Sequence, residues 1–177
     1  MKILIIGLDH QIQSTEEKSD ARLVHVEREQ KEQFRRLLER IVRERRVDFI
    51  GEEFCQSEVS IASRLLDSEK YANVEMPTQL RQERGIPSDY TTNLRVTDER
   101  HRQFDSLRED YIAETFRSKA AAAHARSVLL LCGRRHLAGL SERLKRLSQD
   151  HDVEDYDLRV ESWYLQNWED GLFGRGV

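Results

Sequence analysis

The one long apolar run of the chain lies in Ser127-Val-Leu-Leu-Leu-Cys-Gly-Arg-Arg-His-Leu-Ala-Gly-Leu140, and it stops abruptly at a glycine, two arginines and a histidine. An unbroken apolar run bounded by glycine predicts a strand that is covered on both faces of a parallel sheet. Leucines at positions 137, 140, 144 and 147 then have helical spacing. His136 is therefore predicted where a strand passes into a helix, and ligands of open α/β sheets collect at such places.

The start of the chain repeats this arrangement in Met1-Lys-Ile-Leu-Ile-Ile-Gly-Leu-Asp-His10. Gly7 precedes His10 by three residues, just as Gly133 precedes His136. If the two strands run parallel, they present both imidazoles at the same edge of the sheet. The pair of motifs indicates a site more strongly than either motif alone.

Composition limits the class of protein. A chain of 177 residues suits one domain, and a net charge of −4 with 35% charged residues argues against a nucleic-acid partner. The sequence shows no apolar run of membrane-spanning length and no leader pattern, so we expect a cytoplasmic protein without a membrane partner. The two cysteines, Cys55 and Cys132, are expected to be reduced and partly buried thiols.

The remaining elements follow from apolar periodicity. We expect helices at about 26–46, 57–69 and 97–126, the last being one long helix or two with a kink. Strands are expected at 47–54, at 73–76 and, at the edge of the sheet, at about 153–160. Polar connections are expected at 11–20 and at 78–93, where a helical turn could open the second. The whole predicts a single α/β domain over residues 1–177, with a mainly parallel sheet of about five strands flanked by helices.

The strand at 47–54 ends in two carboxylates, Glu52 and Glu53. Because side chains alternate along a strand, these two point to opposite faces of the sheet, and at most one reaches a shared site easily. His10, one of the two glutamates and His136 would then meet at one sheet edge. Two imidazoles and a carboxylate suit a divalent metal with an open position that acidifies water, and the same groups without a metal suit a general base for bound water.

Three arginines complete the set of candidate site residues. Arg108 lies inside the long helix beside an apolar position, so its guanidinium is expected to reach outward from the rim of the buried face. Arg134 and Arg135 precede His136 and are candidates for binding an anionic substrate or an oxyanion. The other four histidines, at positions 25, 101, 124 and 151, are expected to be surface residues.

The pattern resembles the TraB/TIKI superfamily, which also takes in erythromycin-esterase-like and haem-binding ChaN-like proteins. Gly7-Leu-Asp-His10 and Gly133-Arg-Arg-His136-Leu-Ala-Gly139 resemble the two Gly-x-x-His motifs of that group, and Glu53-Phe-Cys55 resembles its strand-end glutamate. Arg108-Glu-Asp resembles its arginine-containing helix. The chain departs from the group in its short length and in the bulky Arg134 and Arg135.

The resemblance implies a hydrolytic site and favours Glu53 over Glu52. It implies His10, Glu53 and His136 as metal ligands (manganese, cobalt or zinc) or acid/base groups, with Arg108 as an anchor for the substrate or transition state. The expected function is a metal-dependent hydrolase. The alternatives are a metal-independent esterase-like hydrolase, a module that binds a small ligand, metal or haem without turnover, and an interaction protein that dimerises through its C-terminal segment and charged helices. The substrate is expected to be a small molecule or peptide, anionic if the arginines bind it.

The C-terminal segment from about residue 161 is rich in aromatic side chains, among them Trp163, Tyr164, Trp168 and Phe173. So much apolar surface predicts that the segment folds back over the core or meets a second copy of the chain. A homo-oligomer formed through this segment is therefore one expected partner.

Overall fold

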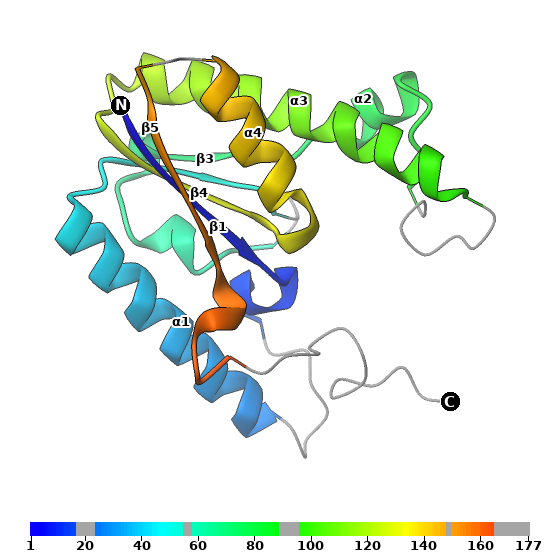
Figure 1. Ribbon diagram of the computed structural model, residues 1–177. Helices are drawn as coiled ribbons and strands as arrows, with labels where there is room; N and C mark the ends of the chain where they lie inside the picture. Colours follow the sequence, from blue (N-terminus) through cyan, green and yellow to red (C-terminus); the bar gives the residue numbers. More distant parts are fainter. Residues whose placement is uncertain (17–23, 55–57, 89–95, 148–149, 165–177) are drawn as a thin grey trace.

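The computed structural model describes residues 1–16, 24–54, 58–88, 96–147 and 150–164. Its centre is a five-stranded sheet in the order β3-β2-β4-β1-β5, and every neighbouring pair is parallel. Figure 1 shows the twisted sheet with helices packed on it. The predicted α/β class with a parallel sheet of five strands is confirmed.

The two central strands are the apolar runs of the sequence. β1 (Lys2–Leu8) pairs with β4 (Ser127–Gly133) along its whole length, with Leu8 opposite Gly133. β2 (Phe49–Glu52) lies on the other side of β4, and the short β3 (Tyr71–Asn73) forms one edge. β5 (Asp152–Asp157) forms the other edge, as its mixed sequence predicts. Because all strands are parallel, their carboxyl ends meet on one side of the sheet.

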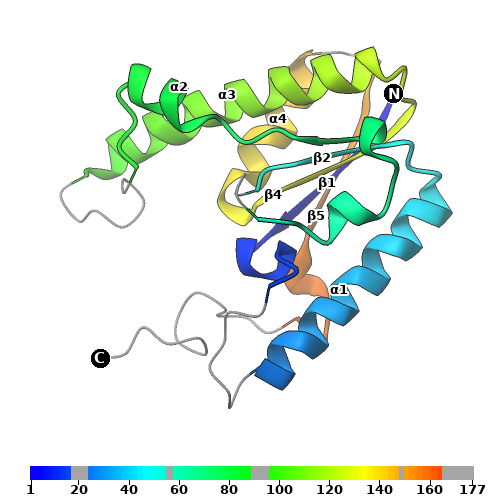
Figure 2. The ribbon, with the colours of Figure 1, turned by 180° about the vertical axis from the view of Figure 1, so that it is seen from behind.

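Helices cover the two faces of the sheet. The side chains of Leu4 and Ile6 pack with α1 (Val24–Arg45) on one face. Ile3 and Ile5 point the other way and pack with α3 (Asp98–Ala122) and α4 (Leu137–Leu147). Figure 2 shows α1 apart from the layer of α3 and α4. The alternation along β1 thus divides the core into two clusters, one on each side of the sheet.

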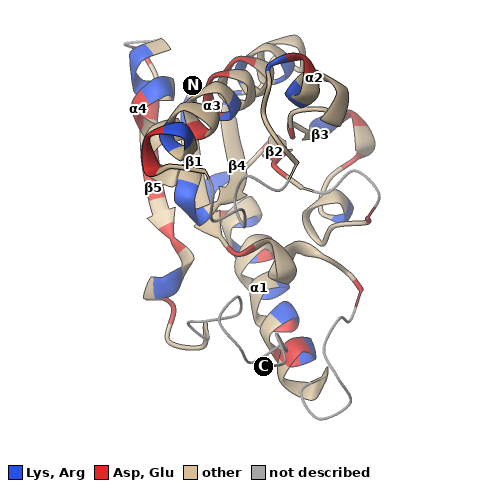
Figure 3. Ribbon diagram, turned by 90° about the vertical axis from the view of Figure 1, so that its right-hand side faces the viewer, with Lys and Arg blue, Asp and Glu red and all other residues tan. Residues whose placement is uncertain are grey.

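The charged face of α1 carries ion pairs within the helix. Arg35 lies 2.7 Å from Glu32 and also pairs with Glu39, and Arg36 lies 2.8 Å from Glu32. Figure 3 shows the two signs of charge interspersed along this helix. These pairs are three or four residues apart and are largely exposed, so they support the helix locally and mark no binding surface.

The N-terminal part of α3 projects beyond the sheet, and α2 (Thr78–Glu83) lies beside it (Figure 1). A small third cluster of Met76, Ile86 and Phe104 joins the two helices. The expected polar connection at 78–93 therefore begins with a short helix, and its residues 89–95 lie outside the described part. α3 itself is one helix of 25 residues, so the version with two helices is wrong.

The helix expected at 57–69 is wrong. The chain there forms two 3-10 turns, η2 (Ala62–Arg64) and η3 (Ser68–Lys70). The cause is backbone pairing with the turn after β1, where Thr15 N–H donates to Val59 O at 3.0 Å and Ile61 N–H donates to Gln13 O at 2.8 Å. These bonds use backbone groups that a helix would need, and they leave Val59, expected to face inward, 50% exposed.

Smaller differences concern the bounds of the strands. The strand expected at 73–76 is displaced, because β3 begins at Tyr71 and ends at Asn73. The strand expected at 47–54 is limited to Phe49–Glu52, and the strand expected at 153–160 ends at Asp157, followed by the 3-10 turn η5 (Leu158–Val160). No helix in the described part of the chain is long and apolar enough to cross a membrane.

Candidate active site

Four strands deliver polar side chains to the carboxyl edge of the sheet. His10 opens the 3-10 turn η1 (His10–Gln13) after β1, Glu53 follows β2, Glu75 follows β3, and His136 ends η4 (Arg134–His136) after β4. The strand order places the ends of β2, β4 and β1 next to one another. The structure therefore brings together the predicted residues His10, Glu53 and His136.

Glu53 lies at the centre of the site and is completely buried. Its Oε1 accepts a hydrogen bond from Arg108 at 2.5 Å, and its Oε2 accepts one from the backbone N–H of Gly133 at 2.9 Å. Nε2 of His136 lies 3.6 Å from Oε1. Burial alone would raise the pKa of Glu53, but the charges of His136, His10 and Arg108 together with the Gly133 N–H outweigh it and hold the pKa below its usual range. Glu53 is therefore a carboxylate at neutral pH.

Arg108 is buried, which corrects the expectation that its guanidinium reaches outward. Besides Glu53, it donates to both oxygens of Glu75 at 3.2 and 3.3 Å. The reason is geometric: α3 crosses the carboxyl edge of the sheet, and a charged side chain on its buried face finds two carboxylates there. Arg108 thus neutralises Glu53 from within the protein. Burial and the nearby charge of Glu53 raise the pKa of Glu75.

His136 is 1% exposed and is held by a second ion-pair chain. Its Nδ1 lies 3.1 Å from Oε1 of Glu109, whose Oε2 lies 2.8 Å from Arg143. Both ring nitrogens of His136 therefore face carboxylates, Glu109 on one side and Glu53 on the other. This arrangement suits an imidazole that stays in place and stabilises charge at the site.

His10 differs from His136 because it is exposed. Its Nδ1 lies 2.7 Å from the side-chain oxygen of Gln13. The amide nitrogen of Gln13 donates to Oε1 of Glu52 at 2.8 Å and to the backbone oxygen of Glu53 at 3.3 Å. Nδ1 is thus occupied, and Nε2 is the ring nitrogen that approaches Gly133.

The motif glycines make room for these contacts. A Cβ atom on Gly133 would lie 2.9 Å from Nε2 of His10, and one on Gly7 would lie 2.9 Å from a methyl group of Leu137. Gly139 likewise leaves room for a neighbouring side chain, because a Cβ atom at this position would lie 2.1 Å from Oε2 of Glu109. In each Gly-x-x-His motif, therefore, the glycine lets a neighbouring segment approach the strand end.

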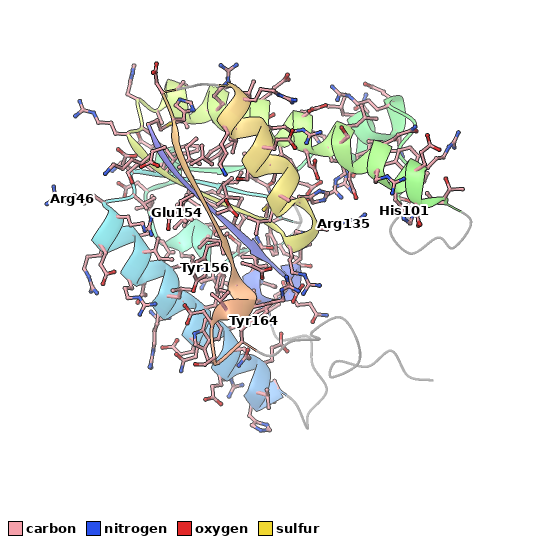
Figure 4. All side chains as sticks on the ribbon, in the orientation of Figure 1. Arg46, His101, Arg135, Glu154, Tyr156 and Tyr164 are labelled. Atoms are coloured by element: carbon pink, nitrogen blue, oxygen red, sulfur yellow. The ribbon has the colours of Figure 1, made fainter. Side chains whose placement is uncertain are left out.

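The two arginines before His136 differ in their surroundings. Arg135, which is labelled in Figure 4, is exposed. Its guanidinium donates to Asp105 of α3 at 2.6 Å. Arg134 is partly buried, and its charge acts on Asp157 and Tyr164. Of the two, Arg134 is the better placed to meet an anion, since Arg135 already has a carboxylate partner.

The predicted metal ligands are His10, Glu53 and His136. Within the described residues, no group of three His, Cys, Asp or Glu side chains is arranged to hold a metal ion. The carboxylate oxygens of Glu53 are bonded to Arg108 and Gly133, so the residues as they stand do not fit a ligand shell. Metal binding by His10, Glu53 and His136 stays a prediction.

Several residues of the site were not found from the sequence. Glu109 could have been, because it lies on the helical stripe that includes Ile112, Ala113 and Phe116 and is buried with them. Gln13 and Glu75 carry no such signal, because their partners come from other strands. Of the remaining predictions, Cys132 is a buried free thiol, His25 and His124 are exposed, and His101 and His151 are partly buried. Cys55, Trp168 and Phe173 lie outside the described residues.

The chain matches no protein-family model, no curated protein and no solved structure.

Proposed function

We propose that the chain is a hydrolase in which His10 removes a proton from a water molecule. The observation that carries this proposal is the contrast between the two histidines. His10 is exposed and has one ring nitrogen engaged by Gln13, whereas His136 is buried between two carboxylates. A general base must be accessible to its substrate, and a charge-stabilising group must be held in place.

In this proposal the carboxylate of Glu53, whose pKa the charge of His10 helps to lower, supplies the negative charge that faces the proton taken up by His10. His136 and Arg108 keep Glu53 ionised. The proton from water goes to His10, and the hydroxide attacks the carbonyl or phosphoryl centre of the substrate. The proton then passes to the leaving group when the bond breaks. No step requires a metal ion.

The substrate is proposed to be a small molecule or peptide with an anionic group that Arg134 binds. The resemblance to the TraB/TIKI superfamily supports hydrolysis but does not choose between ester, peptide and phosphate bonds. A homo-oligomer formed through the C-terminal segment also remains a proposal.

The test is a panel of chromogenic carboxyl esters, phosphate esters and peptide amides, assayed with the natural chain, His10→Asn and Glu53→Gln. The matched control is His124→Asn, which removes an exposed imidazole at the end of α3. Asparagine is accepted at the positive φ of 53° found there. We expect kcat/KM to fall by at least about 100-fold in His10→Asn and in Glu53→Gln, and to stay within about twofold in His124→Asn.

Two results would contradict the proposal. One is the absence of turnover by the natural chain with every substrate class, which would favour a binding module. The other is full activity in His10→Asn. Metal content is measured on the same samples, and the activity is assayed again after treatment with a chelator. Activity that is lost with the chelator and restored by manganese, cobalt or zinc would show that the metal-dependent interpretation is correct.

A further inference from the structure

We propose that Gln13 and Glu52 are positioning residues that hold His10 in the tautomer with its proton on Nδ1, so that Nε2 is the base. This inference rests on the proposed role of His10. Neither residue needs to touch the substrate, and Glu52 acts on His10 only through Gln13.

The orientation of the Gln13 amide follows from its neighbours. Its nitrogen faces two acceptors, Oε1 of Glu52 at 2.8 Å and the backbone oxygen of Glu53 at 3.3 Å. The reverse orientation would place the amide oxygen against two other oxygens. The amide oxygen therefore faces Nδ1 of His10 at 2.7 Å. Because an amide oxygen only accepts, Nδ1 carries the proton, and Nε2 of the neutral ring keeps its lone pair.

Glu52 is in turn held from the other side. Its Oε2 accepts hydrogen bonds from Ser60 at 2.5 Å and from Tyr71 at 2.7 Å, which leaves Oε1 for Gln13. Ser60 Oγ itself accepts the backbone N–H of Ser63 at 3.0 Å, which holds the hydroxyl group beside Glu52. Every oxygen of this fully buried carboxyl group therefore has a fixed donor.

The backbone around Gln13 is fixed as well. Its carbonyl oxygen accepts the N–H of Ile61, and Ser14 forms an isolated antiparallel bridge with Ser60. The same segment that supplies Ser60 to Glu52 thus anchors the turn that carries His10. A buried carboxyl group is costly, and burial raises the pKa of Glu52. We infer that the buried carboxyl group of Glu52 serves to orient His10 through Gln13.

The experiment compares the natural chain with Glu52→Gln and Gln13→Met. In Glu52→Gln the two hydroxyl donors keep the amide oxygen on the Oε2 side, so the new NH₂ group faces Gln13. Gln13 then rotates to accept from it and offers its own NH₂ group to Nδ1 of His10. In Gln13→Met the acceptor is removed without a large change in volume. Both variants are expected to move the proton of neutral His10 from Nδ1 to Nε2.

The readout is the ¹⁵N chemical shift of the two His10 ring nitrogens in labelled protein, followed by kcat and KM where a substrate has been found. We expect Nδ1 to change from a protonated to an unprotonated signal, with kcat reduced at least about 100-fold and KM nearly unchanged. Tyr71→Phe is the matched control, because it removes a hydrogen bond from Glu52 but leaves Gln13 in place. Its His10 signals should match those of the natural chain.

The proposal is overturned if His10 of the natural chain carries its proton on Nε2, or if both variants keep it on Nδ1. A merely structural role for Gln13 and Glu52 predicts that second outcome, with stability reduced. The expected tautomer change without any hydrolysis by the natural chain would confirm the positioning pair and contradict the proposed function instead.

Discussion

Gly133 shows how one missing side chain shapes the site. Its φ of −55° is open to any residue, so the reason for glycine is space and not backbone strain. A Cβ atom there would lie 2.9 Å from Nε2 and 3.4 Å from Cε1 of His10, and 3.6 Å from Oε2 of Glu53. Glycine at this position thus leaves room for the imidazole of His10 beside the end of β4.

We predict that Gly133→Ala displaces His10 and reduces kcat/KM at least about tenfold while the fold is kept. The clash costs about 1–3 kcal/mol of folding free energy, offset in part by the lower entropy of the unfolded alanine chain. Urea unfolding and kcat/KM measure the two effects. The control is the same substitution in a His10→Ala background, where the cost in stability should vanish; an equal cost in both backgrounds would show that His10 is not the residue displaced.

The glutamate pair was predictable only in part. Alternation along β2 correctly places Glu52 and Glu53 on opposite faces, toward Ser60 and Tyr71 and toward Arg108 respectively. What the sequence does not contain is the turn after β1, in which Gln13 connects the face of Glu52 to His10. Such a link depends on tertiary contacts between three segments, so the hydrophobic periodicity of any one segment cannot predict it.

At the scale of elements, the last described residue, Tyr164, forms hydrogen bonds with Asp9, just before the turn that carries His10. Tyr164, which follows η5, is 5% exposed, and its hydroxyl donates to Oδ2 of Asp9 and accepts the Asp9 N–H at 3.2 Å. Figure 4 shows Tyr164 just beyond the end of β5. Burial and the hydrogen bond to Asp9 raise the pKa of Tyr164, so the hydroxyl stays a donor. This contact fixes the entry to η1 from outside the sheet.

We predict that Tyr164→Phe lowers the free energy of unfolding by about 1–3 kcal/mol, because it leaves the buried carboxylate of Asp9 without its donor. The matched control is Tyr156→Phe, which removes a hydroxyl bonded to Glu161 at 2.5 Å in a less buried place and should cost less. Chemical unfolding of both variants measures the difference. Equal losses would mean that the Asp9 contact adds nothing beyond an ordinary surface hydrogen bond.

For the whole molecule, the class of fold was predictable because it depends on strong local signals. The apolar runs of β1 and β4 and the stripe of α1 are long, and parallel pairing follows from their alternation with helices. The same parallel pairing carries His10, Glu53 and His136 to one edge. The segment at 57–69 was mispredicted because its backbone pairs with a distant turn, which helical spacing cannot reveal. The burial of Arg108 could not be predicted from the sequence, because the carboxylates that pair with its guanidinium follow β2 and β3, far from α3 in the sequence.

The buried carboxyl groups also set how the stability of the molecule depends on pH. The pKa of Glu53 is lower in the folded than in the unfolded chain, so its contribution is fully present above the unfolded pKa of about 4.3 and is lost as the pH falls through the folded pKa. The pKa of Glu52 is raised by burial, so the folded chain holds its proton more tightly. Its effect has the opposite sign: stability falls as the pH rises above about 4.3.

We therefore predict that Glu53→Gln is less stable than the natural chain by about 3 kcal/mol at pH 7, because Arg108 loses a buried partner. The difference should shrink steadily between about pH 5 and pH 2, since the natural chain loses its Glu53 contribution as the pH falls from the unfolded pKa to the folded pKa of about 2. Glu52→Gln should behave in the opposite way, with its stability relative to the natural chain rising as the pH increases. Urea unfolding at four or five pH values measures both differences, and curves that stay parallel for all three proteins would show that neither carboxyl group titrates differently on folding. If only the Glu53→Gln curve converges with that of the natural chain, the low pKa of Glu53 is established, and the raised pKa assigned to Glu52 is wrong.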